Sequence, residues 1–288
     1  MSSRRGEGWQ CDHGAQYFTA RDPDFRAEVA RWSRADVAQL WSPRLRVHDG
    51  ISIQDSPASA ERFVGFPRMT APAHFLAQAL TINAQTTIEQ IERLAEGWRL
   101  RSTEHGWLRE HFDAVLLALP APQVVPLLQA PAPELAAIAS GAVMRGCWAL
   151  MMRFDAPVAL PYDAAFVNAG PLRWVARDNS KPGRDGPETW LLHASAEWSE
   201  SHLEEIAESV ASALIEAFRE LDGPSPQQWS AHRWRYADTE PAVNSSCSWN
   251  ANAGLGICGD WLNGGKVEGA WISGRALALR VLGSPRDS

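Results

Sequence analysis

The chain has 288 residues, of which 45% are hydrophobic and 21% are charged, and a formal net charge of −7. This length and composition suit a globular protein with one large domain or two interleaved domains. The sequence has no basic run and no basic amphipathic helix, which disfavours nucleic acid and membrane surfaces as partners. No apolar run approaches the roughly 20 residues of a membrane span. The start of the chain also lacks the apolar core of a signal peptide, so we expect a cytoplasmic protein.

The cysteines indicate a reducing compartment. The four of them are scattered without a C-x-x-C pair: Cys11, Cys147, Cys247 and Cys258. They are typical of reduced thiols in a cytoplasmic protein rather than of a disulfide framework. Cys11 lies next to Asp12 and His13, but no second ligand cluster has zinc spacing, so we predict no metal site.

Hydrophobic spacing predicts alternating helices and strands in the first half of the chain. Asp22 and Pro23 begin an amphipathic helix, as an N-cap followed by a first-turn proline. Short strands are predicted around residues 45–47 and 50–53, a helix from Thr70 to about Leu80, and a hairpin with a turn at residues 104–106. Residues 112–119 form a nearly continuous apolar run, which predicts a strand buried on both faces of a parallel sheet.

The second half is predicted to contain a sheet and two longer helices. Two short helices are expected within residues 120–140. Strands at 147–154, 165–168, 173–176 and 189–195 suggest one antiparallel sheet. Ser201 to Glu204 match a capping box before a helix running from Ile206 to Phe218. The chain ends with a buried strand at 254–258, a glycine-rich turn, and a helix from about Val267 to Leu282.

The glycine-rich turn at residues 256–270 is the strongest chemical signal. Glycines let a ligand approach the backbone, and the amides at a helix N-terminus favour anions. The Asp260 carboxylate can accept a hydrogen bond from a ribityl or ribose hydroxyl, and amides near Glu268 to Ala270 can face the pyrimidine edge of a flavin. A glycine-rich connection in which Asp260 only begins the helix explains the same residues equally well.

Two further segments carry polar and aromatic residues. The Gly14-Ala15 pair would let a flat ring lie against the backbone, with His13, Gln16 and Tyr17 nearby; a satisfied strand end is the alternative. Strand alternation at residues 232–236 places His232, Trp234 and Tyr236 on one face and two arginines, Arg233 and Arg235, on the other. That arginine face suits either an anionic substrate or a solvated strand with ion pairs.

These motifs together, in this order, resemble the bacterial renalase-like FAD-dependent oxidoreductases of the flavin-containing amine oxidase superfamily. The similarity covers essentially the whole chain and lies in six segments: Asp12 to Thr19, Phe166 to Asn168, Ser180 to Arg184, Leu192 to Ser195, His232 to Tyr236, and Gly259 to Trp271.

The resemblance implies an α/β fold with two domains. A Rossmann-like FAD domain of the p-hydroxybenzoate-hydroxylase type would be interrupted by a substrate domain built on an antiparallel sheet. Residues 1–20, 68–121 and 255–288 would form the FAD domain, and residues 21–67 and 122–254 the substrate domain.

The resemblance also implies a function and a set of site residues. The protein would bind FAD, take hydride from a dihydropyridine-like substrate (an isomeric NAD(P)H) or an amine, and pass the electrons to dioxygen. The cofactor residues would be His13, Gly14, Ala15, Gln16, Gly259, Asp260, Val267, Glu268, Gly269 and Ala270. The substrate residues would be Arg177, His232, Trp234, Tyr236 and Trp261. The alternative is a non-catalytic remnant that binds flavin weakly or not at all.

The sequence departs from the family at its start. The family opens with a strand, a G-x-G-x-x-G turn, a helix and a second strand ending in an acidic residue, which this sequence lacks. We therefore expect roughly 35–40 further residues to be encoded in frame upstream, the usual size of such a unit. We expect the 288-residue form to aggregate and to isolate without colour.

Overall fold

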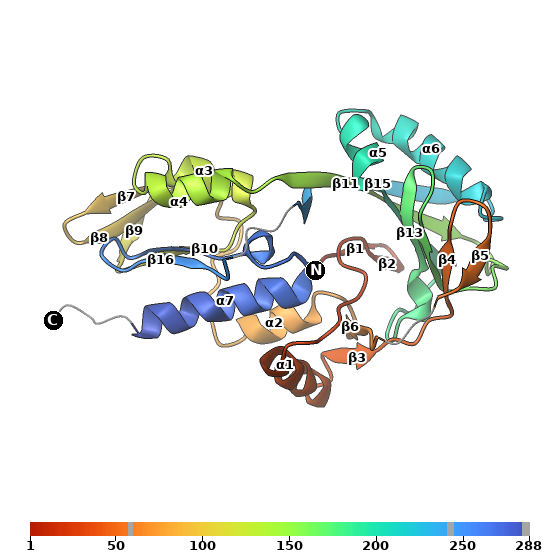
Figure 1. Ribbon diagram of the computed structural model, residues 1–288, viewed down its shortest axis with the longest axis horizontal. Helices are drawn as coiled ribbons and strands as arrows, with labels where there is room; N and C mark the ends of the chain where they lie inside the picture. The colour runs from red at the N-terminus through yellow and green to blue at the C-terminus, as the bar shows by residue number, and fades with distance from the viewer. Residues whose placement is uncertain (57–59, 241–244, 284–288) are drawn as a thin grey trace. The chain divides into compact units, whose positions relative to one another are not determined.

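A computed structural model of the chain describes residues 1–56, 60–240 and 245–283 (Figure 1). The chain forms two compact units. Unit 1 comprises Met1–Gln78 and Arg145–Ala237, and unit 2 comprises Ala79–Met144 and Asp238–Ser288. Each unit is therefore built from segments that are distant in the sequence.

Unit 1 is organised around a seven-stranded sheet with the order β15-β11-β14-β13-β12-β4-β5. Its strands are β4 (Leu45–His48), β5 (Ile53–Asp55), β11 (Met144–Phe154), β12 (Ala164–Val167), β13 (Leu172–Arg177), β14 (Glu188–Ala194) and β15 (Gln228–Thr239). Strands β11, β14, β13 and β12 pair antiparallel, which confirms the predicted sheet. The pairing of β12 with β4 is parallel and was not foreseen.

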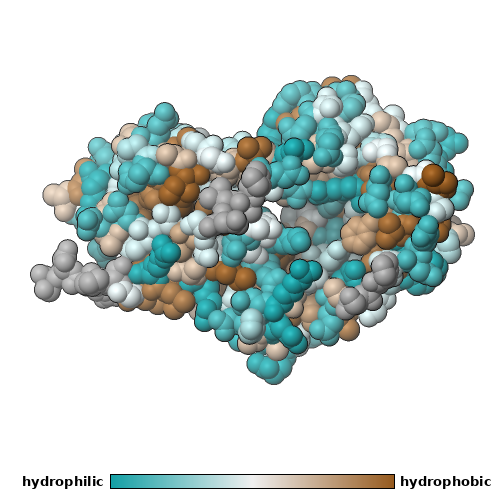
Figure 2. All heavy atoms as spheres, in the orientation of Figure 1, coloured by the Kyte–Doolittle hydropathy of each residue, from teal (hydrophilic) through white to brown (hydrophobic). Residues whose placement is uncertain are grey.

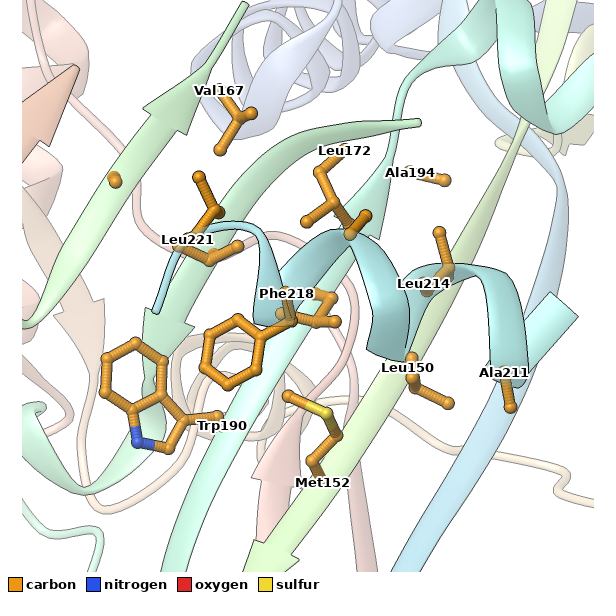
Figure 3. Packing of buried hydrophobic residues seen from close by; sticks show 14 of the residues in the cluster. Leu150, Met152, Val167, Leu172, Trp190, Ala194, Ala211, Leu214, Phe218 and Leu221 are labelled. Atoms are coloured by element: carbon orange, nitrogen blue, oxygen red, sulfur yellow. The ribbon is translucent and has the colours of Figure 1, made fainter. Parts of the chain in front are cut away.

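Two helices of unit 1, α5 (Ala196–Ser201) and α6 (Ala207–Arg219), carry apolar side chains that join the sheet in the main core. Leu214 and Phe218 of α6 lie over Leu150, Met152 and Trp190 of the strands (Figure 3). All five side chains are almost completely buried, so hydrophobic burial fixes this helix on the sheet.

The capping box predicted at Ser201 to Glu204 is wrong. Ser195 caps α5 instead, by accepting a hydrogen bond from the backbone N–H of Trp198. Ser201 is the last residue of α5, and α6 begins after Ile206, which has no side chain able to cap. The serine that satisfies an orphan amide is therefore the residue that directly follows β14, at the start of α5.

The N-terminal part of unit 1 consists of short elements. They are β1 (Ser3–Gly6), β2 (Trp9–Asp12), α1 (Pro23–Arg34), β3 (Ala38–Leu40), β6 (Phe63–Gly65) and α2 (Ala71–Ala77); the 3-10 turn η1 (Asp178–Ser180) comes later in the chain, after β13. Asp22 caps α1 as predicted. The helix predicted to reach Leu80 stops at Ala77, and Leu76 and Leu80 are 41% and 65% exposed. Their exposure leaves no apolar face to hold a further turn.

Unit 2 contains two small sheets and three helices. The elements are β7 (Ile88–Leu94), β8 (Gly97–Ser102), β9 (Gly106–Phe112), β10 (Val115–Leu117), α3 (Ala121–Leu128), α4 (Pro133–Ser140), β16 (Ser248–Asn250), β17 (Leu255–Ile257), the 3-10 turn η2 (Asp260–Leu262) and α7 (Lys266–Gly283). The hairpin of β8 and β9, the two short helices and the final helix are confirmed.

The apolar run at residues 112–119 is only partly the buried strand that was predicted. Strand β10 does pair parallel with β17. However, Phe112 ends β9 in the other sheet, and β10 itself has three residues. Leu116 and Leu119 are 45% and 38% exposed, so the run is not buried on both faces. One hydrophobic stretch here serves two sheets, which periodicity alone does not reveal.

The two units do not follow the domain boundaries that the resemblance implies. Residues 1–20 belong to unit 1, where β2 contacts β14 and Asp12 binds residues of the η1 region. Residues 122–144 belong to unit 2, because α3 and α4 contribute to the same core as Trp98 and Ile257.

Hydrophilic and hydrophobic residues are interspersed over the visible face (Figure 2). Among the described helices, none combines the length and the apolar character that a bilayer crossing requires. All four cysteines are free and buried.

Candidate functional site

Asp12, the last residue of β2, is the centre of a buried polar network in unit 1. Its Oδ2 accepts hydrogen bonds from Arg184 Nε at 3.1 Å and Nη2 at 2.5 Å. Its Oδ1 accepts the Ser3 hydroxyl and the backbone N–H of Met69 at 3.2 Å. Burial alone would raise the pKa of this carboxyl, but the Lys181 and Arg184 cations hold it below its ordinary value.

Lys181 is the second cation of this network and is only 2% exposed. Its ammonium donates to Asp178 Oδ1 at 2.8 Å and to Gln16 Oε1 at 3.0 Å. Burial raises the pKa of Asp178 despite the nearby ammonium. We call Asp12, Asp178, Lys181 and Arg184 the buried ion cluster; its two carboxylates are balanced by its two cations.

The buried ion cluster fixes the chain that follows β2. The Gln16 side chain, oriented by Lys181, donates to Asp12 O at 2.6 Å and to Gly14 O at 3.2 Å. The amide of Gln16 thus ties both ends of residues 12–16 together. Among the predicted cofactor residues of this segment, Gly14 has no side chain and Ala15 only a methyl group, so a ligand would meet their backbone. The side chain of Gln16 is already hydrogen-bonded within the protein.

His13 lies in an aromatic group with two residues of β15. Its ring stacks on Trp234 at a centroid distance of 5.1 Å and meets His232 edge-on at 4.8 Å. The His13 carbonyl accepts the Trp234 indole N–H at 2.9 Å and lies 3.1 Å from His193 Nε2. These contacts join three of the predicted site residues, two of which are separated from His13 by more than 200 residues.

The electrostatics of this aromatic group favour neutral rings. Burial lowers the pKa of His13 to about 4, and the neighbouring His232 and Arg4 act in the same direction. Burial and Arg4 also lower the pKa of His232. The Nδ1 atom of His13 is buried and has no hydrogen-bond partner among the described residues. A buried polar atom of this kind is expected to meet a ligand or water.

The remaining substrate residues do not join the aromatic group. Tyr236 is 37% exposed further along β15. Arg177 donates to Val158 O at 2.6 Å, pairs with Glu188 of β14 at 3.4 Å and lies with its guanidinium 5.2 Å from the Trp190 ring centroid, so its charge is paired within unit 1. The Arg233 and Arg235 side chains pair with Glu204, which confirms the ion-pair alternative for that strand face.

Unit 2 carries the other predicted cofactor residues at the start of α7. The Asp260 carboxylate accepts the backbone N–H of Trp261 at 2.9 Å, and burial raises the pKa of Asp260. Gly264 and Gly265 have positive φ angles of 73° and 69° before α7 begins, and Lys266, its first residue, has a φ of 68°. Glycine adopts this left-handed conformation without the strain that a side chain would bring.

Packing explains two of the unit 2 residues without a ligand. A Cβ atom at Gly269 would lie 2.1 Å from the carbonyl oxygen of Asn263, so only glycine fits. Trp261 is fully buried in the unit 2 core, and its indole N–H donates to Leu119 O at 3.0 Å. Gly259 donates its N–H to the Ser273 hydroxyl at 2.9 Å. Val267 and Glu268 are half-buried, and Ala270 is exposed.

The sequence did not identify the buried ion cluster as part of the site. Asp12, Lys181 and Arg184 were noticed only as members of motifs, and no role was given to them. Their partners lie more than 160 residues apart, which no local pattern reveals. The available signal was a lysine and an arginine within a Pro-Gly turn, next to strands that are otherwise apolar.

No family model matches the chain. Among solved structures, it is similar to a protein described as a protoporphyrinogen oxidase from Exiguobacterium sp. 255-15, with a TM-score of 0.61 and 17% identity over 78% of this chain and 53% of that one. Cyclohexylamine oxidase from Brevibacterium oxydans IH-35A gives 0.57 and 15% over 77% and 54%. Wild-type putrescine oxidase bound to putrescine gives 0.52 and 13% over 78% and 54%.

The chain has the fold of these oxidases. It spans about half the length of each of them. The mixed α/β class expected from the sequence is confirmed at this level, whereas the renalase-like resemblance and the upstream segment stay predictions.

Proposed function

We propose that the protein is an FAD-dependent oxidoreductase of the amine oxidase type. Two independent lines support the proposal: the ordered motifs resemble that superfamily, and the fold is shared with amine oxidases. The observation that carries it is the backbone of residues 12–16, which is held by the buried ion cluster on one side and by the aromatic group on the other.

The residues of unit 1 fit a flat aromatic ligand. Gly14 and Ala15 present backbone with almost no side chain; a Cβ at Gly14 would lie 3.3 Å from the Ser2 nitrogen, so the face of Gly14 toward Ser2 is filled by the chain itself. The unpartnered His13 Nδ1 provides a polar contact at the edge of this surface. A rigid peptide with these features suits the isoalloxazine ring.

The chain supplies orientation and electrostatics to the reaction. FAD, when bound, would supply the acceptance of hydride from the substrate and the transfer of electrons to dioxygen. His232 and Trp234 would hold the substrate with their aromatic faces. The lowered pKa of both histidines keeps their rings neutral at pH 7, which avoids repulsion of a protonated amine or of the pyridinium product of a dihydropyridine. This environment favours a dihydropyridine-like or amine substrate.

The proposal is tested by adding FAD to the purified protein and recording the visible spectrum and oxygen consumption. Dihydropyridine dinucleotides and primary amines serve as the two substrate panels. With the predicted upstream segment present, we expect flavin absorbance to remain with the protein and oxygen to be consumed with one panel, whereas the 288-residue form alone should stay colourless. An extended protein that retains no flavin and consumes no oxygen with either panel would show that the proposal is wrong.

A matched pair of variants on β15 tests the substrate side. Trp234→Phe removes the indole N–H that His13 O accepts and shrinks the aromatic face, so KM should rise about tenfold, as expected for one lost hydrogen bond and reduced packing. Trp229→Phe on the same strand packs against the main core instead, and its KM should be unchanged.

A further inference from the structure

Unit 1 contains a cavity of about 480 Å³ that no predicted site residue lines. Arg5 and Arg68 border it, together with His74 of α2. Phe66 and Phe75 are part of its apolar wall. We call it the arginine pocket. Its size falls within the range of small-molecule sites, which is roughly 300–1,000 Å³.

The charges of the arginine pocket are not balanced by the protein. Neither Arg5 nor Arg68 has an ion-pair partner among the described residues. Elsewhere in unit 1 the arginines commonly pair with carboxylates, as Arg44 does with Asp163. Asp36 is the single carboxylate in the lining, and it already accepts the Gln39 amide at 2.8 Å. In a chain with a net charge of −7, two unpaired guanidinium groups at one cavity indicate an anionic ligand.

The lining indicates which anion. Guanidinium forks match the oxygens of phosphate groups. A phosphate ion alone would leave most of the cavity empty, whereas the Phe66 and Phe75 rings suit a planar apolar group. The Phe66 ring packs directly against the backbone of Gly183, where a Cβ would lie 2.7 Å from the ring. We propose that the arginine pocket binds the phosphate-bearing part of a nucleotide through Arg5 and Arg68.

The arginine pocket is continuous with the segment proposed to face the flavin. Ser3 lines the pocket, and its hydroxyl donates to Asp12. The Met69 N–H, between the lining residues Arg68 and Thr70, donates to the same carboxylate at 3.2 Å. The arginine pocket is therefore connected to Asp12 of the buried ion cluster through the Ser3 hydroxyl and the Met69 backbone. The phosphate can belong to a flavin dinucleotide or to a reduced nicotinamide dinucleotide, and binding itself does not depend on flavin chemistry.

The test is calorimetric titration of flavin-free protein with ADP and with adenosine. Arg5→Gln and Arg68→Gln should each weaken ADP binding about tenfold or more, because each removes charge-assisted hydrogen bonds. Arg68→Lys should give an intermediate loss, since the charge remains without the fork. Arg26→Gln is the matched control: it removes the same charge from an exposed residue of α1 outside the pocket and should bind ADP as the parent does. Adenosine should bind weakly and equally to the parent and to all four variants.

Two outcomes overturn the proposal: ADP binding that is unchanged in both glutamine variants, or adenosine binding as tight as that of ADP. Thermal melting of each variant separates lost binding from lost folding. Competition identifies the source of the phosphate, because FAD displaces ADP if the pocket serves the cofactor and reduced nicotinamide dinucleotide displaces it if the pocket serves a substrate. A protein that binds ADP through both arginines but never retains flavin supports this inference and contradicts the proposed function.

Discussion

Replacing Lys181 with methionine tests whether the buried ion cluster is electrostatically balanced. The change preserves most of the side-chain volume but removes the cation, which leaves Gln16 Oε1 without its donor and Asp178 with the Asp12 N–H in place of a cation. Breaking a buried ion pair by removing one partner costs about 3–5 kcal/mol. Because the stability of a domain is about 5–15 kcal/mol, unit 1 should lose a large part of its free energy of unfolding.

The pH dependence of this loss follows from Asp178. Burial already raises its pKa, and Lys181 is the largest factor that lowers it. Without the lysine the folded-state pKa rises further above the ordinary value of 3.8. A folded state with a raised carboxyl pKa gains protons before the unfolded chain does, so its stability improves as the pH falls. The deficit should therefore be smaller at pH 5 than at pH 8.

Urea denaturation followed by tryptophan fluorescence measures both effects. Trp41 is a useful reporter, since the Lys181 ammonium lies 5.7 Å from its ring centroid. The double variant Lys181→Met with Asp178→Asn restores the charge balance and should recover part of the loss. A deficit below about 1 kcal/mol, or the same deficit at both pH values, would refute the electrostatic argument.

Three further predictions concern single residues. The His13 imidazole should titrate near its lowered pKa of about 4 in proton NMR. Because the unfolded chain binds the proton at a higher pH than the folded chain does, this group lowers the stability of the fold as the pH falls from 6.5 towards 4. A titration midpoint above 6 would contradict the argument that burial lowers the pKa of His13. Gly269→Ala should destabilise unit 2 by about 1–3 kcal/mol in urea denaturation, because its Cβ meets the Asn263 carbonyl at 2.1 Å, whereas Gly274→Ala in the same helix points into open space and should stabilise by up to about 1 kcal/mol; equal effects would remove the packing argument. Asp260→Ala should release flavin faster during dialysis by removing a charge-assisted hydrogen bond of about 1.5–3 kcal/mol, and unchanged retention would exclude Asp260 as a ligand.

Local patterns predicted the elements well where the chain itself supplies the signal. The N-cap at Asp22 and the hairpin of β8 and β9 depend on neighbouring residues, and both were correct. The capping box at Ser201 was wrong because Ser201 belongs to the end of a separate short helix, α5, which Ser195 caps, and α6 begins after Ile206 without a side-chain cap. Sequence spacing does not distinguish such alternatives.

The candidate site was predictable in part. Alternation along β15 correctly placed His232 and Trp234 on one face and Arg233 on the other. It did not predict that His13 would meet that face, because this contact depends on how β2 lies against the sheet. Arg177 was selected for its charge as a substrate residue, yet it pairs with Glu188 at 3.4 Å and donates to the carbonyl of Val158. Charged residues with buried partners are recognised only once the fold is known.

The parallel pairing of β4 with β12 has a consequence for how unit 1 assembles during synthesis. The hairpin of β4 and β5 leaves the ribosome more than 100 residues before β12, the strand that it borders. Asp12 likewise cannot form its ion pair until Arg184 has been synthesised, 172 residues later. Non-local pairing of this kind slows folding, because the chain loses the entropy of closing a long loop before the stabilising contacts form. The first 78 residues therefore remain without their sheet until the chain has reached residue 184, so premature termination before that point should yield an unfolded, protease-sensitive product.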